Sequence, residues 1–230
     1  YSGDRTMDLG TERYLAINKF MTQQAFAGCF DAPSLIRTVP RILTHGLTNV
    51  NILDLAPEDN TVPRFANFVD FIPRFSTSCA QLIEGVSKNE DPSHTVAWTI
   101  IGSPLVTVAM PLVLLPNDKL PETVGRGTTG GSTLCRYGLK LKERLFPLRT
   151  KTRSSYIDVA QLVNRKGNGI LQLIRPIEDE LMDKGTALVN NLRNEKEGNK
   201  KEGNKKDVYK AFADYYSWAD GVIKEQYEKG

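Results

Sequence analysis

Apolar residues are densest between Ser76 and Leu115, and their pattern predicts an antiparallel sheet. The runs TVAWTII and LVTVAMPLVLL are rich in β-branched residues and flank a Gly-Ser-Pro turn, as expected for two successive buried strands. Upstream, RFSTSCAQLIEGV predicts a further strand, closed by the polar turn SKNEDPSH. We therefore expect Ser76–Val86 and Val96–Leu114 to form neighbouring antiparallel strands. The residues expected inside this core are Trp98, Ile100, Val106 and Val108.

Before the predicted sheet, apolar residues recur at the three-to-four-residue spacing of helices. Residues Glu12–Ala27 predict a helix that Gly28 stops, and Asp31 is a good N-cap for a second helix. Pro40 should kink this second helix or end it early, because proline cannot continue the hydrogen-bond ladder. The stretch Pro57–Pro73 has no period and predicts a covering loop, with a short strand at FANFVDF.

After the predicted sheet, apolar residues again recur at the spacing of helices. The segment LCRYGLKLKERLF predicts a helix with a basic outer face, and a longer helix follows it. The acidic run Glu178, Asp179 and Glu180 is expected on the solvent side of the longer helix, as a solvated face rather than as catalytic carboxylates. The apolar stripe of that helix consists of Ile170, Ile174, Ile177, Leu181, Leu188 and Leu192.

The composition changes after Asn194 and suggests a division of the chain. The sequence KEGNK occurs twice in tandem, and no apolar residue lies between Leu192 and Val208. We predict a main domain over 1–194, a polar linker over 195–207 and an amphipathic helix over 208–230. The aromatic stripe of this last helix favours docking on the domain; the alternative is a helix that binds a partner.

Composition excludes several function classes. The 230 residues contain 30 Lys and Arg against 27 Asp and Glu, and no basic stripe with interleaved aromatics, so nucleic-acid binding is not expected. The two histidines and three widely spaced cysteines offer little for a metal site, a catalytic triad or a disulfide framework, and no cofactor is predicted. The apolar run over 96–115 is interrupted by Gly102, Ser103, Pro104 and Pro111, so no transmembrane segment is expected.

Individual residues and motifs have plain interpretations. Cys79 lies within a predicted strand, where a small buried apolar residue is expected, and His94 lies in a turn, where a solvent-facing or capping role is expected. The connector GRGTTGGST lacks the lysine of a phosphate-binding loop. The chain opens with YSGDRTMDLG, without an initiator Met or a signal segment, and is expected to be processed or part of something longer.

Several segments carry a resemblance to a known family. These are the opening YSG with its following arginines, FVDFIPRFSTSCAQLIEGV, DPSHTVAWTIIGSPLVTVAMPLVL, LKLKERLFP and LVNRKGNGILQLIRPIEDEL. Together they resemble the C-terminal half of bacterial linear-amide hydrolases related to acyl-coenzyme A:6-aminopenicillanic acid acyltransferase, in the N-terminal-nucleophile (Ntn) superfamily. The resemblance covers about Tyr1–Asn194, and its most specific pattern is W-T-x-x-G-x-P-x-x-x-V-A-x-P over Trp98–Pro111.

The resemblance implies an Ntn-hydrolase-like αββα sandwich of antiparallel sheets flanked by helices. In this family an N-terminal Cys is the nucleophile, and its own α-amino group, with a pKa of about 7.7–8.0, is the base, so the chemistry needs neither histidine nor metal. The nucleophile, its supporting acid and the oxyanion Asn would all lie upstream of the YSG segment. The implied partners are therefore a small-molecule amide substrate and the N-terminal half of the same protein. A periplasmic or secreted location is favoured.

Two arginines are the candidate substrate-binding residues. Arg5 and Arg13 follow the point where the family's oxyanion Asn would lie, so they are candidates to orient a substrate carboxylate by bidentate pairing, although surface salt bridges are the favoured role for both. The expected function is thus the C-terminal part of an amide hydrolase or acyltransferase acting on linear C–N bonds. The alternative is a non-catalytic interaction module that binds a partner through its basic connector or its last helix.

Overall fold

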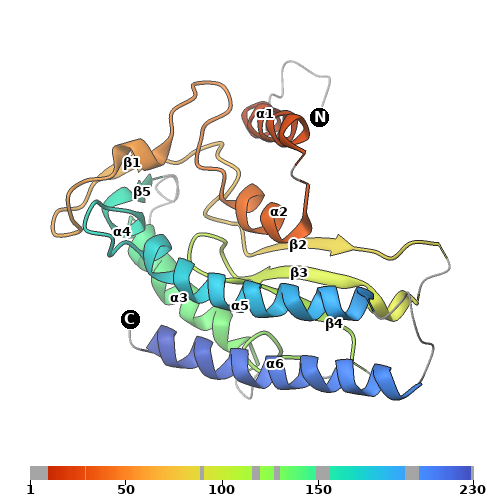
Figure 1. Cartoon of the computed structure of the whole chain (residues 1–230). Helices are drawn as coiled ribbons and strands as arrows, with labels where there is room; N and C mark the ends of the chain where they lie inside the picture. The colour runs from red at the N-terminus through yellow and green to blue at the C-terminus, as the bar shows by residue number, and fades with distance from the viewer. Residues whose placement is uncertain are drawn as a thin grey trace.

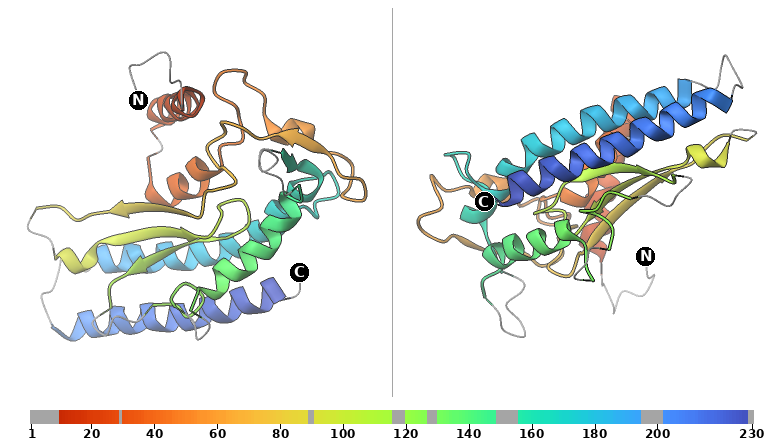
Figure 2. Two further views of the ribbon diagram at one scale, coloured as in Figure 1. Left: turned by 180° about the vertical axis from the view of Figure 1, so that it is seen from behind. Right: turned by 90° about the horizontal axis from the view of Figure 1, so that it is seen from below.

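The computed structural model describes residues 10–28, 30–88, 91–115, 120–126, 130–148, 156–194 and 202–228. In this part of the chain, helices combine with antiparallel sheets (Figure 1). The larger sheet lies at the centre, and two long helices run along one of its faces (Figure 2). The predicted α+β class is therefore confirmed.

The larger sheet contains the strands that the apolar runs predicted. Strands β2 (Cys79–Glu84), β3 (Val96–Ile101) and β4 (Ala109–Val113) are antiparallel and lie in the order β2-β3-β4. Trp98 in the central strand lies opposite Leu82 on one side and a proline of β4 on the other. The prediction of neighbouring antiparallel strands is confirmed.

The connection from β3 to β4 spans residues 102–108 and begins at the predicted Gly-Ser-Pro sequence, so residues 105–108, predicted as strand, lie in the connection instead. Gly102 has a φ of 96°, a left-handed conformation that glycine adopts without the steric cost of a side chain. The chain then turns back, and the hydroxyl of Thr107 donates to the carbonyl of Ser103 at 2.8 Å. The four residues predicted for the core, Trp98, Ile100, Val106 and Val108, are all buried.

Two long helices form a layer on the larger sheet. Helix α5 (Ile170–Asn194) and helix α6 (Glu202–Glu228) lie side by side and run in opposite directions (Figures 1 and 2). The aromatic stripe of α6 points inward, with Phe212 and Tyr215 buried. The prediction that the last helix docks on the domain is confirmed.

Close contacts fix this helical layer on β4. A Cβ added to Gly185 in α5 would lie 2.5 Å from the Pro111 ring, so only glycine allows the helix to come so near. The hydroxyl of Tyr216 in α6 accepts from the Val113 amide at 2.8 Å and donates to its carbonyl at 3.1 Å. Shape complementarity and hydrogen bonds therefore act together here.

The N-terminal elements begin and end where local chemistry predicted. Helix α1 (Thr11–Ala27) ends at Gly28, which has the left-handed φ of a helix cap. Helix α2 (Ala32–Thr38) starts after Asp31, whose side chain accepts from the amide three residues on. The chain then tightens into the 3-10 helix η1 (Val39–Arg41), which contains the proline expected to end α2 early.

The smaller sheet joins distant parts of the chain. Strand β1 (Phe65–Asn67) pairs antiparallel with β5 (Tyr156–Asp158), so the short strand predicted in the covering loop is confirmed. Helix α3 (Thr133–Leu145) matches the predicted basic helix, and the short α4 (Val159–Leu162) follows β5. The remaining short elements are the 3-10 helices η2 (Ile52–Leu55) and η3 (Pro92–His94).

Helix α6 begins at Glu202, inside the second KEGNK repeat and before the predicted start at 208. Residues 195–201 lie outside the described part of the chain. The division of the chain into 1–194, 195–207 and 208–230 stays a prediction.

Candidate functional site

The two faces of the larger sheet have different environments. On the face toward the helices, Val96, Trp98 and Ile100 are fully buried. On the opposite face, the alternate residues of β2 are exposed, among them Ile83, with 61% of its side chain accessible. Thr99 of β3 and Met110 of β4 lie on this face too but are buried, so the exposed part of the face is its β2 side. Leu114, just beyond β4, is 74% exposed. We call the face that carries Ile83 the open sheet face.

Helix α1 also presents apolar residues to solvent. Its only buried residue is Ala16, whereas Tyr14, Leu15 and Ile17 are at least one-third exposed and Phe26 is 89% exposed. Isolated apolar side chains on a surface are ordinary, but α1 buries only an alanine and leaves several larger apolar residues exposed along one short segment. The β2 side of the open sheet face and α1 are thus two exposed apolar surfaces.

Arg13 lies in the first turns of α1, and the structure brings it to Asp70. Its Nη1 donates to the Asp70 carboxylate at 2.8 Å, and both side chains are partly exposed. The surface salt bridge expected as one role of Arg13 is therefore present. Arg5, the other candidate, lies outside the described residues.

Further contacts hold α1 against the loop before η2. Lys19 donates to the side chain of Asn49 at 3.0 Å. Gly46 touches the helix backbone, since an added Cβ would lie 1.9 Å from the carbonyl oxygen of Glu12. Because a larger residue would push the helix away, Gly46 fixes the position from which Arg13 reaches Asp70.

Asp70 lines a pocket of about 380 Å³ beside this pair. The pocket combines an apolar wall with three further polar residues: His45, Thr48 and Asn67. The Nδ1 atom of His45 accepts from the Thr48 amide at 3.2 Å, so the proton of a neutral imidazole is on Nε2. The His45 ring meets Phe71 edge-on, with centroids 5.4 Å apart. A mainly apolar hollow with a few polar groups is typical of small-molecule sites.

Backbone strain coincides with this pocket. Within the described residues, Asn49 and Asp70 are the non-glycine positions with positive φ, at 58° and 65°. Asp70 lines the pocket, Asn49 follows the pocket residue Thr48, and each accepts a hydrogen bond from a basic residue of α1. Strained conformations persist only where their surroundings impose them, and they often cluster at binding sites. The pocket and its α1 contacts are therefore the candidate substrate site.

Glu178 corrects a prediction. It was expected on the solvent side of its helix, yet it is 2% exposed and forms a bidentate ion pair with the buried Arg41 at 2.7 and 2.8 Å. It also accepts from the Ala109 amide at 2.6 Å. Its neighbour Asp179 is exposed and pairs with Arg37. The prediction failed because a run of acids was interpreted as one face, although consecutive helical residues point in different directions.

The remaining donors of Arg41 are used within the protein. Its Nε donates to the Pro104 carbonyl at 2.6 Å, and its terminal nitrogens donate to the carbonyls of Thr107 at 2.9 Å and Arg37 at 3.1 Å. These bonds join η1 and α2, the β3–β4 turn and α5. A guanidinium so fully engaged has no free donor for a substrate, so this cluster is a structural polar centre.

Two other predictions about single residues are corrected. Of the two roles expected for His94, the solvent-facing one is wrong, because His94 is buried with 7% exposure at the end of η3. Cys79 is exposed at the first position of β2, instead of buried within a strand. Partial desolvation raises the pKa of the Cys79 thiol, which disfavours the reactive thiolate. Cys135 is half-buried, and Cys29 lies outside the described residues.

Across the described ranges, no group of three His, Cys, Asp or Glu side chains is placed to bind a metal ion. None of the helices in these ranges has both the length and the apolar character needed to cross a bilayer.

No protein family, curated protein or solved structure was found to match this chain.

Proposed function

We propose that this chain is the C-terminal part of a cysteine Ntn amide hydrolase or acyltransferase that acts on linear C–N bonds. The observation that carries the proposal is the asymmetry of the larger sheet, which is buried on one face by α5 and α6, whereas its edge strand β2 exposes Ile83 on the other face. In an αββα sandwich each sheet carries helices on one face and packs its other face on a second sheet. The open sheet face is where the N-terminal half of the protein would supply that second sheet.

The reacting groups would come from residues upstream of Tyr1. An N-terminal Cys would lose its thiol proton to its own α-amino group and attack the amide carbonyl, while backbone amides and an Asn side chain would stabilise the oxyanion. Neither described cysteine is favoured as the nucleophile, since Cys79 has a raised pKa and Cys135 is half-buried. This agrees with a nucleophile located upstream. This chain would contribute sheet strands and part of the substrate pocket.

Substrate binding would fall to the pocket beside Arg13 and Asp70. In the proposed complex a substrate carboxylate would share the Arg13 guanidinium with Asp70 or displace it, while the apolar wall holds the acyl group or side chain. The substrate class is therefore a small linear amide with a free carboxylate, such as an N-acyl amino acid or a penicillin-like amide. Arg5 is proposed for the same role.

The decisive experiment compares residues 1–230 with the same chain extended upstream to an N-terminal Cys. Both proteins are incubated with a panel of N-acyl amino acids and penicillin-like amides, and folding is checked by circular dichroism. Turnover is expected only from the extended protein, and alanine in place of its N-terminal Cys should abolish it. Comparable turnover by residues 1–230 would overturn the proposal.

The alternative function is a non-catalytic interaction module. Its best support is the exposed apolar surface on the sheet and on α1. The aromatic stripe of α6 is already buried, so the last helix does not offer that stripe to a partner. A well-folded, monomeric extended protein without turnover on any amide would favour this alternative.

A further inference from the structure

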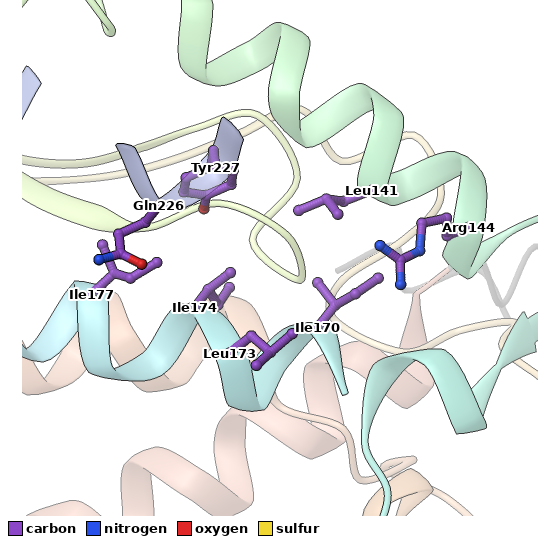
Figure 3. Close-up of a pocket in the computed structure, with 8 residues that line it drawn as sticks. All are labelled: Leu141, Arg144, Ile170, Leu173, Ile174, Ile177, Gln226 and Tyr227. Atoms are coloured by element: carbon purple, nitrogen blue, oxygen red, sulfur yellow. The ribbon is translucent and has the colours of Figure 1, made fainter. Parts of the chain in front are cut away.

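A second pocket lies away from Arg13, where α3, α5 and α6 meet (Figure 3). Its volume is about 310 Å³, at the lower end of the range for small-molecule sites. Residues of α5 form its floor, Leu141 of α3 lies across from them, and Tyr227 of α6 closes one side. The floor residues are Ile170, Leu173, Ile174 and Ile177. We call this pocket the α3–α5–α6 groove.

The groove has a distinct polar group at each end. The guanidinium of Arg144 points inward near Ile170, and Gln226 lies at the other end near Ile177 (Figure 3). Arg144 donates to the Gln161 side chain at 3.3 Å, and within the described ranges it forms no ion pair. Among the residues that the structure describes, no acidic side chain lines the groove. Its electrostatic character is therefore set by one cation at one end.

Tyr227 acts as a wall and not as a ligand-binding hydroxyl. Its hydroxyl already donates to the Val106 carbonyl at 3.0 Å. Burial raises the pKa of this phenol, so it stays neutral at physiological pH. The middle of the groove thus offers apolar surface, and the charge lies only at the Arg144 end.

We propose that the α3–α5–α6 groove binds an unbranched aliphatic carboxylate, with its carboxylate on Arg144 and its chain along the floor. From Ile170 to Ile177 the floor extends about 10 Å along the helix axis, which suits a medium-length chain. Each buried methylene contributes up to about 0.8 kcal/mol, whereas the exposed ion pair mainly sets the orientation. The proposal rests on this groove alone and does not depend on the amide-hydrolase function.

The test is a methyl NMR titration of the 230-residue protein with octanoate, octanol and octylammonium. Octanoate should shift the methyl signals of the four floor residues and bind more tightly than octanol, while octylammonium should bind most weakly. Decanoate should bind more tightly than octanoate, by up to about fourfold per added methylene. Equal affinity for octanoate and octylammonium, or shifts confined to the open sheet face, would overturn the proposal.

Two variants and one control make the test specific. Arg144→Gln should weaken octanoate binding about threefold to fivefold and leave octanol binding unchanged. Leu173→Gln places a polar group on the half-exposed floor and should weaken both ligands. Arg136→Gln removes an exposed arginine of the same helix outside the groove and should change neither. Unaltered octanoate affinity in Arg144→Gln, or methyl shifts that depend on protein concentration without ligand, would count against the proposal.

Discussion

Glu178 and Arg41 face each other inside the protein, where Arg41 donates two hydrogen bonds to the Glu178 carboxylate, and neither side chain is more than 7% exposed. The pair lies between the helical layer and the β3–β4 turn, because Arg41 also binds the Pro104 carbonyl and Glu178 also binds the Ala109 amide. Desolvation of two charges is costly, so such a pair does not by itself add much stability. Loss of one partner is nevertheless severe, since the other charge stays buried.

Glu178→Gln should therefore lower the free energy of unfolding by about 3–5 kcal/mol, because it leaves the Arg41 charge without a counter-ion. Urea unfolding monitored by circular dichroism measures the loss. Asp179→Asn is the matched control: it removes an exposed carboxylate that pairs with Arg37, and should cost at most about 1 kcal/mol. Equal losses in the two variants would contradict the buried ion pair.

Tyr216→Phe should cost about 1–3 kcal/mol at neutral pH, because the Val113 amide and carbonyl lose their shared partner. Tyr209→Phe is the control; its half-buried hydroxyl binds Ser93, and solvent can replace that bond more easily. Urea unfolding at pH 7 compares the two variants. A smaller loss for Tyr216→Phe than for Tyr209→Phe would show that the Val113 contact is not made.

The same tyrosine predicts a pH effect. Burial raises the pKa of Tyr216 to about 12 from the ordinary 10.0. Between these values the unfolded chain loses a phenol proton that the folded protein keeps, so stability should fall as the pH rises from about 10 to 12. Tyr216→Phe should show a shallower fall over this window, with part of the slope remaining because burial also raises the pKa of Tyr215 and Tyr227. An unchanged slope would contradict the assignment.

Two glycines of the helical layer should respond in opposite directions to alanine. Gly185→Ala places a methyl group 2.5 Å from the Pro111 ring and should destabilise the protein by about 1–3 kcal/mol. Gly221→Ala meets nothing within 4 Å on the exposed side of α6, and should stabilise by about 0.5–1 kcal/mol through helix propensity. The thermal unfolding midpoint should fall for Gly185→Ala and rise for Gly221→Ala. A higher midpoint for Gly185→Ala would mean that α5 lies farther from β4.

Ile83→Lys tests whether the open sheet face is covered in the extended protein. In residues 1–230 the change should raise solubility and alter stability by no more than about 0.5 kcal/mol, because Ile83 is mostly exposed. If a second sheet covers this face, the same change should cost the extended protein more than about 2 kcal/mol. Val62→Lys, in an exposed loop, is the control for added charge. If Ile83→Lys changes the stability of both proteins equally, no second sheet covers this face.

Arg13→Gln should raise KM for N-acyl amino acids about tenfold in the extended protein, because a charge-assisted contact to the substrate carboxylate is lost. Amides without a carboxylate should be turned over as before. Lys19→Gln, which loses a comparable contact from the same helix to Asn49, is the matched control. An equal effect on charged and uncharged amides would assign Arg13 a purely structural role with Asp70.

Much of the fold was predictable because it depends on local chemistry. The turn at Gly102, the Asp31 cap, the Gly28 stop and the break at Pro40 each follow from the conformational limits of one residue, and the core strands follow from β-branched runs. The pairing of β1 with β5 was not predictable in the same way, since their sequences lie far apart and each strand is only three residues long.

The candidate site and the buried polar centre were less predictable, because both depend on contacts between distant segments. Nothing local connects Arg13 with Asp70, or Arg41 with Glu178. One signal was present: Glu178 lies four residues after Ile174 and three before Leu181, and so shares the apolar stripe of α5. An acid on a buried stripe needs a buried cation, but only the folded chain identifies that cation.

The contacts made by β4 determine where the larger sheet can be extended. On the side of β4 away from β3, the Ala109 amide is bound by Glu178, Pro111 has no N–H, and both backbone groups of Val113 are bound by Tyr216. An incoming strand therefore finds no free backbone N–H donors at these three positions of that edge. Within the described residues β2 pairs only with β3, so its outer edge is the one to which a strand from another segment or molecule can add.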